Sequence, residues 1–579
     1  MYKSLVQLTS RAFSVSYRHG PHPTPIKYLT IGQQLTETAH HFPDHPAVIS
    51  AFQNVTLTYP QLQEKAKVLA ASLVHLGFER GDRIGIYSPN NYEWIVVQYA
   101  AAIAGLILVN INPAYQSNEL KYALNKVGCK GIITANKFKS SNYIEILNEI
   151  LPELKTSKPN QLSSQGVPSL RLLVRIDDEQ TPGFLNFKEL FDVPGSDDYQ
   201  KLGMIQNSIS PEDAINIQFT SGTTGNPKGA TLSHLNILNN GERTAQRVGF
   251  TDQDGIALSV PLYHCFGMIV GNMAALSCGA AICLPSEAFS AKATLEAVEK
   301  YKLTTLYGVP TMFLEYIKEK EVSNRDTLTL RKGIIAGALA PRPLMEAIMG
   351  KLNVHEISNG YGMTETSPFT VMTHPNDSFE RKVSTVGNVM DHCEIKIADT
   401  EGRAVPYNTP GEYWARGYPT MIGYWGDDAN TLKTKSLDGW VRSGDIASMD
   451  ETGYVKIVGR IKDMIIRGGE NVYPKEIEDF LLTQDPNIED VQCFGVPDEK
   501  FGEEICVWIK RKDPSKELPK LKIKEYCHKK IAHYKMPKFV VCVEDIPMTV
   551  TGKPQKFKMR DIMAHELKNP AKVQEYMIR

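Results

Sequence analysis

The chain has 579 residues, of which 42% are hydrophobic and 22% charged, and its formal net charge is −1. This length favours more than one domain, and the near-zero net charge argues against a polyanionic partner bound through bulk charge. Nine scattered cysteines without a CxxC pair indicate reduced thiols rather than a disulfide framework or a zinc site.

The amino-terminal segment differs in composition from the rest. Its cationic residues are Lys3, Arg11, Arg18 and Lys27, and no Asp or Glu precedes Glu37. An amphipathic basic segment without acidic residues predicts a mitochondrial (matrix) targeting leader over residues 1–36, with a disordered basic tail as the alternative. The proline-rich stretch "GPHPTP" at 20–25 would end a leader helix.

Helix and strand patterns then alternate. Residues 59–77 have a helical pattern and 83–88 that of a strand. The apolar run 94–109 is interrupted by Gln98 and Gly105 and is too short to span a bilayer. We interpret it as a buried helix, a glycine stop and a buried strand, and predict no transmembrane segment.

Alternation resumes over 214–360, after a polar Pro/Ser-rich stretch at 151–170 that is typical of a surface loop. This order predicts an α/β fold: a large domain over 37–460 with doubly wound, mainly parallel sheets. Residues 383–459 are strand-rich and predict a small β-rich lobe of that domain.

Residues 461–579 predict a small mobile α+β carboxy-terminal domain. Strand patterns occur at 464–467, 503–511 and 539–545, and helical patterns at 474–482 and 521–531. Residues 510–560 contain fifteen lysines and arginines against five acidic residues. This charge fits a solvated face, a nucleic-acid surface or a lid that faces phosphates.

The loop "FTSGTTGNPKGATLSH" (219–234) follows a predicted strand at 214–219. Backbone N–H groups of glycines and small residues can close around phosphate oxygens, and Lys228 adds a positive charge. The hydroxyl donors of the loop are Thr220, Ser221, Thr223 and Thr224. It lacks the GxxxxGK[ST] pattern, and only Ser233 resembles a helix N-cap. We therefore predict a phosphate-binding hairpin loop, with a flexible linker as the alternative.

Other segments carry candidate nucleotide contacts. "SNGYGMTETS" (358–367) places Tyr361, whose ring can stack on a purine, near Glu365, whose carboxylate can hold Mg²⁺. Asp445 follows a tight turn and can accept two ribose hydroxyls. Lys553 lies on a predicted turn in the basic segment. Each has a plain structural alternative: core tyrosine, turn former and surface lysine.

The motifs "TSGTTGNPKG", "YGMTE", "SGD", "GRIKDMIIRGGENVYP" and "TGKPQK" occur in the order typical of the acyl-adenylate-forming superfamily. The resemblance covers residues 35–565. The stretches "PLYHCFG", "LYGVPTMF" and "GYWGD" are most similar to the mitochondrial medium-chain acyl-CoA ligase branch. This resemblance implies that a carboxylic acid and ATP form an acyl-adenylate and pyrophosphate, and that coenzyme A then gives acyl-CoA and AMP.

The resemblance also implies roles for individual residues. The β- and γ-phosphates of ATP would be held by Thr220, Ser221, Gly222, Thr223, Thr224, Gly225, Asn226, Pro227 and Lys228. The adenine would be lined by Gly337, Ala338, Leu339, Gly360 and Tyr361. Thr364 and Glu365 match the α-phosphate and Mg²⁺ positions, and Asp445 and Arg460 match the ribose contacts.

The remaining matches concern catalysis, the acid and coenzyme A. Lys553 matches the lysine that bridges substrate carboxylate and nucleotide, and His264 the position beside the acyl pocket. Lys462 matches the hinge, and Gly468 and Gly469 the coenzyme A tunnel. Ala338 and Leu339 depart from the glycine or serine and alanine of many relatives, which affects the shape of the pocket.

The resemblance implies a small-molecule carboxylic acid as substrate. The branch it resembles implies a medium-chain fatty acid, with an aromatic or other carboxylic acid as the alternative. Luciferase-like oxygenation, transfer to a carrier protein and a non-catalytic nucleotide-binding protein are the weaker hypotheses. No nucleic-acid partner is expected. The sequence leaves open whether the chain forms a homo-oligomer.

Overall fold

The computed structural model describes residues 15–220, 227–323, 325–337, 340–468, 470–498, 500–528, 530–549 and 553–578. They form two compact units. The larger unit contains residues 18–395 and 415–442, and the smaller contains 15–17, 396–414 and 443–578 within the described ranges. The predicted domain boundary at 460 thus differs from this division, which groups residues 443–460 with the carboxy-terminal part.

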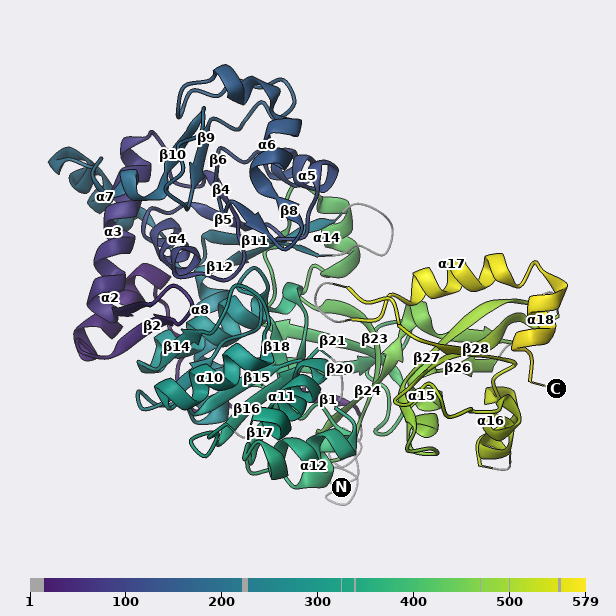
Figure 1. Ribbon diagram of the computed structural model, residues 1–579. Helices are drawn as coiled ribbons and strands as arrows, with labels where there is room; N and C mark the ends of the chain where they lie inside the picture. Colours follow the sequence, from purple (N-terminus) through teal and green to yellow (C-terminus); the bar gives the residue numbers. More distant parts are fainter. Residues whose placement is uncertain are drawn as a thin grey trace. The chain divides into compact units, whose positions relative to one another are not determined.

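The larger unit contains an eight-stranded sheet in the order β10-β9-β6-β4-β5-β11-β12-β22 (Figure 1). Its strands are β4 (Arg83–Tyr87), β5 (Ile107–Asn110), β6 (Gly131–Thr134), β9 (Leu172–Arg175), β10 (Phe184–Asn186), β11 (Ala214–Thr220), β12 (Lys228–Ser233) and β22 (Gly423–Tyr424). The pairs from β10 to β11 are parallel, whereas β11, β12 and β22 pair antiparallel. The hairpin of the predicted phosphate loop therefore lies toward one edge of this sheet.

A nine-stranded sheet in the order β19-β18-β17-β16-β15-β13-β14-β2-β3 completes the larger unit. Its strands are β2 (Pro46–Ser50), β3 (Val55–Thr58), β13 (Gly255–Ala257), β14 (Ala281–Leu284), β15 (Thr305–Gly308), β16 (Lys332–Ala336), β17 (Glu356–Gly362), β18 (Phe369–Met372) and β19 (Asn388–Val389). The six central strands are parallel, and antiparallel pairs occur only at the two ends of the described sheet.

Helices connect these strands, as the alternating pattern predicts. They include α2 (Ile31–His41), α3 (Tyr59–His75), α4 (Tyr92–Ile103), α5 (Ser117–Val127), α6 (Tyr143–Ile150), α7 (Ser196–Ser208), α8 (His234–Val248), α10 (Ala291–Tyr301), α11 (Pro310–Ser323) and α12 (Arg342–Lys351). The run 94–109 forms most of α4, a turn at Gly105 with φ +65°, and most of β5. That interpretation is confirmed. Among the described helices, none combines the length and hydropathy that a membrane span requires.

The stretch 151–170 is less loop-like than predicted. It contains a short 3₁₀ helix, η1 (Pro152–Thr156), and buries Leu154, Leu162, Val167 and Leu170 in a hydrophobic cluster. Because these four apolar residues follow neither a helical nor a strand period, the sequence pattern gives no sign of their burial.

The smaller unit contains the sheet β26-β25-β28-β27, with β29 paired to β28 (Figure 1). Its strands are β25 (Ile465–Arg467), β26 (Glu470–Val472), β27 (Ile488–Asp498), β28 (Gly502–Arg511) and β29 (Phe539–Val543). Helices α15 (Pro474–Leu482), α16 (Lys520–Cys527), α17 (Lys556–Glu566) and α18 (Pro570–Tyr576) complete this α+β fold. Ile477 and Leu481 of α15 are buried in its core, as the helical spacing predicts.

A further sheet, in the order β1-β20-β21-β23-β24, is formed by strands that precede β25 in sequence. Its strands are β1 (Tyr17–His19), β20 (Cys393–Ala398), β21 (Gly411–Gly417), β23 (Val441–Met449) and β24 (Val455–Arg460). Strands β20, β21, β23 and β24 account for the strand-rich pattern predicted for 383–459. The sheet ends at Arg460, directly before the short 3₁₀ helix η5 (Ile461–Asp463).

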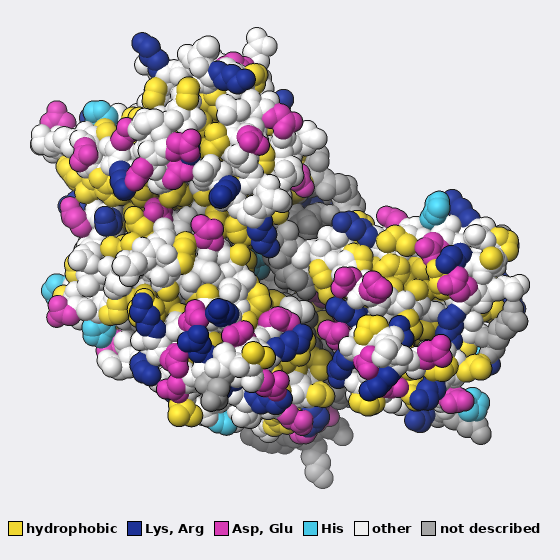
Figure 2. Space-filling model, in the orientation of Figure 1, with side chains coloured by type: hydrophobic (Ala, Val, Ile, Leu, Met, Phe, Trp, Pro, Cys, Tyr) yellow, Lys and Arg dark blue, Asp and Glu magenta, His cyan; other side chains and the backbone are white. Residues whose placement is uncertain are grey.

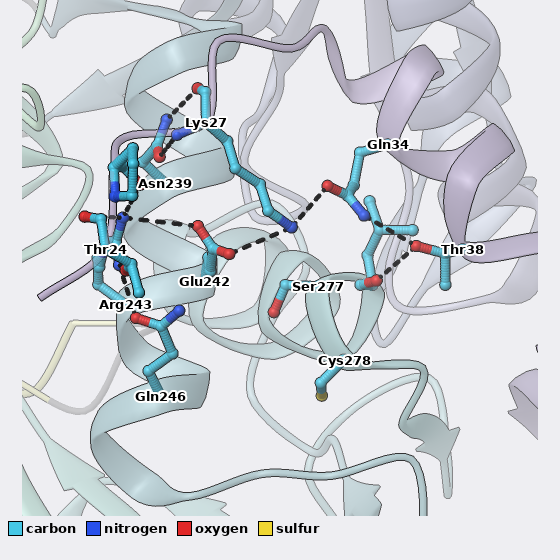
Figure 3. A network of polar contacts seen from close by, with 12 residues as sticks. Thr24, Lys27, Gln34, Thr38, Asn239, Glu242, Arg243, Gln246, Ser277 and Cys278 are labelled. Carbon is cyan, nitrogen blue, oxygen red and sulfur yellow. Dashed lines mark hydrogen bonds and ion pairs between the residues drawn. The ribbon is translucent and has the colours of Figure 1, made fainter. Parts of the chain in front are cut away.

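The amino-terminal segment is part of the fold from Val15 onward. Lys27 contacts α8, where its N–H donates to Asn239 (2.8 Å) and its ammonium lies 3.1 Å from Glu242 (Figure 3). Arg243, almost fully buried, donates hydrogen bonds to Thr24 and to the carbonyl of Pro25. A leader that extends to residue 36 would remove these contacts. The leader boundary at residue 36 stays a prediction; residues 15–36 are folded, and residues 1–14 lie outside the described part of the chain.

The basic segment 510–560 is partly neutralised by ion pairs. The pairs are Lys510–Asp545, Lys516–Asp513, Lys535–Glu476, Lys538–Asp498 and Lys556–Glu478. On the visible face, Lys and Arg side chains of this unit alternate with Asp and Glu (Figure 2). The excess of lysine therefore overstates the basic character of the surface.

All nine cysteines are free, and eight of them lie buried or half-buried. Burial raises the pKa of the Cys129 and Cys283 thiols to about 12, which keeps them protonated.

Candidate active site

The predicted phosphate loop joins β11 to β12. Thr220 and Lys228 face each other across the two strands at the base of the loop. The carbonyl of Pro227 accepts a hydrogen bond from the Tyr122 hydroxyl (3.2 Å). The tip of the loop lies outside the described residues; it comprises Ser221, Gly222, Thr223, Thr224, Gly225 and Asn226. The base is thus fixed on two strands of the large sheet.

The start of α8 follows this hairpin directly. The Ser233 hydroxyl accepts a hydrogen bond from the Asn236 N–H (3.1 Å) and caps the helix. The N-cap predicted from the sequence is confirmed.

Glu365 lies in a short 3₁₀ helix, η4 (Thr364–Thr366), and is 6% exposed. One of its carboxylate oxygens, Oε1, accepts a hydrogen bond of 2.7 Å from the Tyr424 hydroxyl. Its backbone carbonyl accepts the N–H of Met421. Within the described part of the chain, Oε2 receives no hydrogen bond and is left as an acceptor.

Tyr424 also contacts the base of the phosphate loop. The Lys228 ammonium lies 4.9 Å from the centre of its ring, within cation–π distance. Burial, followed by the nearby Glu365 carboxylate, raises the pKa of Tyr424, so its hydroxyl stays protonated as a hydrogen-bond donor. The structure therefore brings Lys228 and Glu365, two predicted site residues, to opposite parts of one tyrosine side chain.

Tyr424 is absent from the residues that sequence reasoning assigned to the site. The motif "GYWGD" that contains it indicates family resemblance but no role for the tyrosine. A tyrosine followed by a turn carries no chemical signature of its own. The contact with Glu365, 59 positions away along the chain, emerges only from the fold.

His264 and Thr364 both lie close to the sulfur of Cys265. The Cys265 sulfur lies 3.6 Å from Nδ1 of His264 and 4.0 Å from the hydroxyl of Thr364. The chain then continues as a π-helix, Phe266–Met273, and the Phe266 ring stacks on Tyr307 at 5.6 Å. The predicted acyl-pocket and α-phosphate positions are therefore neighbours.

Gly360 and Tyr361 lie near the end of β17, next to η4. A Cβ atom on Gly360 would lie 2.6 Å from the ring of Phe369, so packing requires glycine here. Gly337 follows the neighbouring strand β16 and has φ +89°, which favours glycine. Ala338 and Leu339, also predicted to line adenine, lie outside the described residues.

Asp445 and Arg460 face each other across β23 and β24 in the smaller unit. The Arg460 Nε lies 3.2 Å from an Asp445 carboxylate oxygen. Lys462 follows in η5, and burial and the charge of Arg460 lower its pKa. The Arg560 guanidinium, from α17, donates to the carbonyls of Lys462 and Asp463. The predicted ribose pair is thus held by its own strands, and the predicted hinge follows it directly.

Lys553 is exposed and is hydrogen-bonded to Thr549; the three residues between them lie outside the described part of the chain. Its N–H donates to the Thr549 hydroxyl (2.9 Å), and its carbonyl accepts the Thr549 N–H. Gly468 adopts φ +59°, and its N–H donates to the carbonyl of Phe501 (2.8 Å). Gly469, its predicted partner in the coenzyme A tunnel, lies outside the described residues.

Comparison with known families decides what these elements belong to. The AMP-binding enzyme family matches residues 35–425, and the AMP-binding enzyme C-terminal domain matches residues 476–553. The chain belongs to the AMP-binding enzyme family.

Curated relatives resemble this AMP-binding enzyme over nearly its whole length. The mitochondrial medium-chain acyl-CoA ligase ACSF2 of Mus musculus is 44% identical over 560 residues, covering 96% of this chain and 91% of the relative. The Homo sapiens protein of the same name is 43% identical over 561 residues, covering 96% and 90%.

Solved structures show the same fold. An anthranilate CoA ligase, AuaEII, in complex with anthranoyl-AMP superposes with a TM-score of 0.82 over 94% of this chain and 99% of that one, at 23% identity. ATP-bound MatB from Rhodopseudomonas palustris gives a TM-score of 0.76 over 93% and 99%, at 25% identity. The predicted α/β class with a small carboxy-terminal α+β domain is confirmed.

The family's use of ATP raises the question of Mg²⁺. Magnesium in ATP sites is bound by one or two carboxylates together with substrate phosphates rather than by a full protein cage. Glu365 fits this requirement, because it offers an ordered carboxylate oxygen next to the base of the phosphate loop. Among the described residues, no group of three or more His, Cys, Asp or Glu side chains could hold a metal ion.

Proposed function

We propose that this AMP-binding enzyme is an acyl-CoA ligase that activates a medium-chain fatty acid in two steps. The acid's carboxylate attacks the α-phosphorus of ATP, the bond to pyrophosphate breaks, and an acyl-adenylate forms. The coenzyme A thiol then attacks the acyl carbonyl and releases AMP. The observation that carries the proposal is the 43–44% identity to medium-chain acyl-CoA ligases across about 96% of the chain.

The geometry supports the first step. A carboxylate is already a nucleophile, so the step needs charge stabilisation and alignment rather than a catalytic triad. Lys228 supplies a positive charge at the base of the phosphate loop, and Glu365 is the residue that would hold Mg²⁺ beside it. When bound, Mg²⁺ would neutralise charge on the phosphate oxygens.

The remaining roles follow the sequence motifs. Asp445 and Arg460 would contact the ribose, and Lys553 would contact the acid's carboxylate during adenylation. Lys462, in the short helix that follows β24, would serve as the pivot about which the carboxy-terminal part turns between the two steps. Gly468 and Gly469 would border the path of coenzyme A.

An acid panel tests the substrate class. Coenzyme A ligation should be measured with saturated acids of two to eighteen carbons and with several aromatic acids. The proposal predicts the highest kcat/KM among medium-length acids. A maximum among aromatic acids would instead support the alternative, a different carboxylic acid–CoA ligase.

We further propose that the protein acts in mitochondria and that a basic leader lies before Val15. The relatives' mitochondrial names and the acid-free amino-terminal composition support this. Residues 1–14 fused to a fluorescent protein should direct it to mitochondria, whereas a version with Lys3 and Arg11 replaced by Glu should not. Equal distribution of the two fusions would contradict the proposal.

A further inference from the structure

The backbone around Tyr424 is fixed on both sides. In the short strand β22, Tyr424 pairs with Ala230 of β12, and its N–H donates to the Thr431 hydroxyl (2.8 Å). The next residue, Trp425, donates its N–H to the carbonyl of Gly229 (2.8 Å). The phenol is therefore directed by backbone contacts with the strand that leaves the phosphate loop.

The hydroxyl of this phenol meets a buried carboxylate. Tyr424 and Glu365 are both less than a tenth exposed, and their hydrogen bond is 2.7 Å long. Hydrogen bonds to charged groups in such surroundings are stronger than neutral ones. The bond commits Oε1 of Glu365 to the phenol and leaves Oε2 as the acceptor for a ligand.

The face of the same ring meets a cation. The Lys228 ammonium lies 4.9 Å from the ring centre. Lys228 is the first residue of β12, so its ammonium places a positive charge at the base of the loop. One side chain thus contacts both charges that the proposed function assigns to Mg²⁺-ATP.

We propose that Tyr424 is a positioning residue for adenylation: its hydroxyl orients the Glu365 carboxylate, and its ring places the Lys228 ammonium, for Mg²⁺-ATP. This rests on the proposed function, because it assumes that Glu365 and Lys228 handle the nucleotide. Thioester formation from acyl-adenylate requires neither Mg²⁺ nor pyrophosphate. The role therefore concerns the first half-reaction and not the second.

The Tyr424→Phe variant separates this role from a purely structural one. It keeps the ring and its contact with Lys228 but removes the donor to Glu365. The loss of a hydrogen bond to a buried charge should slow acid-dependent ATP–pyrophosphate exchange about 10- to 100-fold. The half-saturating Mg²⁺ concentration should rise several-fold, and high Mg²⁺ should restore part of the rate.

Two further readouts complete the test on the full chain. Calorimetry should show that Mg²⁺ with α,β-methylene-ATP, which is not cleaved, binds several-fold more weakly to Tyr424→Phe than to the unmodified protein. Thioester formation from synthetic octanoyl-AMP and coenzyme A should stay within about twofold. The matched control is Tyr59→Phe, which also removes a buried hydroxyl donor, in this case to the carbonyls of Ala275 and Ala280. It should leave the Mg²⁺ dependence unchanged.

Each outcome decides the question. Loss of both half-reactions by Tyr424→Phe, whether through chemistry or failure to fold, would make Tyr424 structural and overturn the inference. An unchanged Mg²⁺ dependence and unchanged binding would overturn it as well, while leaving the proposed function intact. Absence of acid-dependent exchange in the unmodified protein would overturn the proposed function, and the inference with it.

Discussion

Buried His234, at the start of α8, makes the stability of the larger unit depend on pH. Its Nδ1 accepts a hydrogen bond from the Ile31 N–H (3.2 Å), so the proton of the neutral ring lies on Nε2. A second proton would have to go on Nδ1 and break that bond. Nε2 is itself buried without a hydrogen-bond partner among the described residues. Burial lowers the pKa of His234 from 6.5 to about 3.

The sign and the size of the effect follow from proton binding. Between pH 6.5 and 3 the unfolded chain binds a proton at His234 and the folded chain does not, so acid favours unfolding. At pH 7.5 the effect is close to zero. At pH 5.5 it amounts to about 1.4 kcal/mol, because the pH is then about one unit below the unfolded pKa.

The assay compares the unmodified protein with His234→Gln, whose amide oxygen can accept from Ile31 but does not titrate. Urea unfolding followed by tryptophan fluorescence gives the free energy of unfolding at both pH values. The variant should be less stable by about 1–3 kcal/mol at pH 7.5, since the substitution disturbs packing. At pH 5.5 this gap should narrow by about 1.4 kcal/mol.

A control and a local readout sharpen the test. His40→Gln, at an exposed position, should lie within about 0.5 kcal/mol of the unmodified protein at pH 7.5. Hydrogen exchange of the peptide that contains Ile31 should quicken on acidification in the unmodified protein more than in His234→Gln. A gap that stays constant between the two pH values would refute the reasoning that His234 is held neutral.

Three substitutions test other parts of the account. Gly360→Ala should lower the free energy of unfolding by about 1–3 kcal/mol, because the added Cβ would clash with Phe369. The control Gly350→Ala, which has open space at its Cβ, should leave the free energy of unfolding unchanged. Equal melting temperatures for the two variants would contradict this. Lys553→Ala should slow adenylation by up to about a thousandfold, as expected for a charge about 4 Å from the reacting phosphate, and spare thioester formation from acyl-AMP. Equal losses in the two half-reactions would reject that role. Asp445→Ala should raise the KM for ATP about 10- to 100-fold through lost hydrogen bonds to ribose, and an unchanged KM would remove Asp445 from the nucleotide site.

Regular elements with a clear hydrophobic period were predictable from the sequence. The helical pattern at 59–77 corresponds to α3 (Tyr59–His75), and the pattern in 474–482 places Ile477 and Leu481 in the core of the smaller unit. The cap at Ser233 was also foreseen, because it depends on residues three positions apart. In each case the signal and the structure are local.

Features that depend on distant partners were not predictable. The long strand β27 (Ile488–Asp498) ends in Pro497 and Asp498, which lack strand propensity. Along the described sheet path it pairs only with β28, and such an edge strand tolerates a proline at its end. The sequence alone suggests that Lys27 belongs to a basic leader. The structure shows that it pairs with Glu242, more than 200 positions away along the chain.

The candidate site shows the same limit. Glu365 and Lys228 were identified from their motifs, and Tyr424, which touches both, was not. Motifs identify residues whose chemistry is distinctive by type, such as a carboxylate or an ammonium in a glycine-rich stretch. A residue that acts by holding others is recognised only when the contacts are known.

Acid-dependent exchange of radiolabelled pyrophosphate into ATP, in the absence of coenzyme A, tests the central claim most directly. The account predicts that purified protein with Mg²⁺, ATP and octanoate forms labelled ATP at a rate that falls to background when the acid is omitted. No exchange with any acid of the panel would contradict the claim that the protein activates carboxylic acids as adenylates.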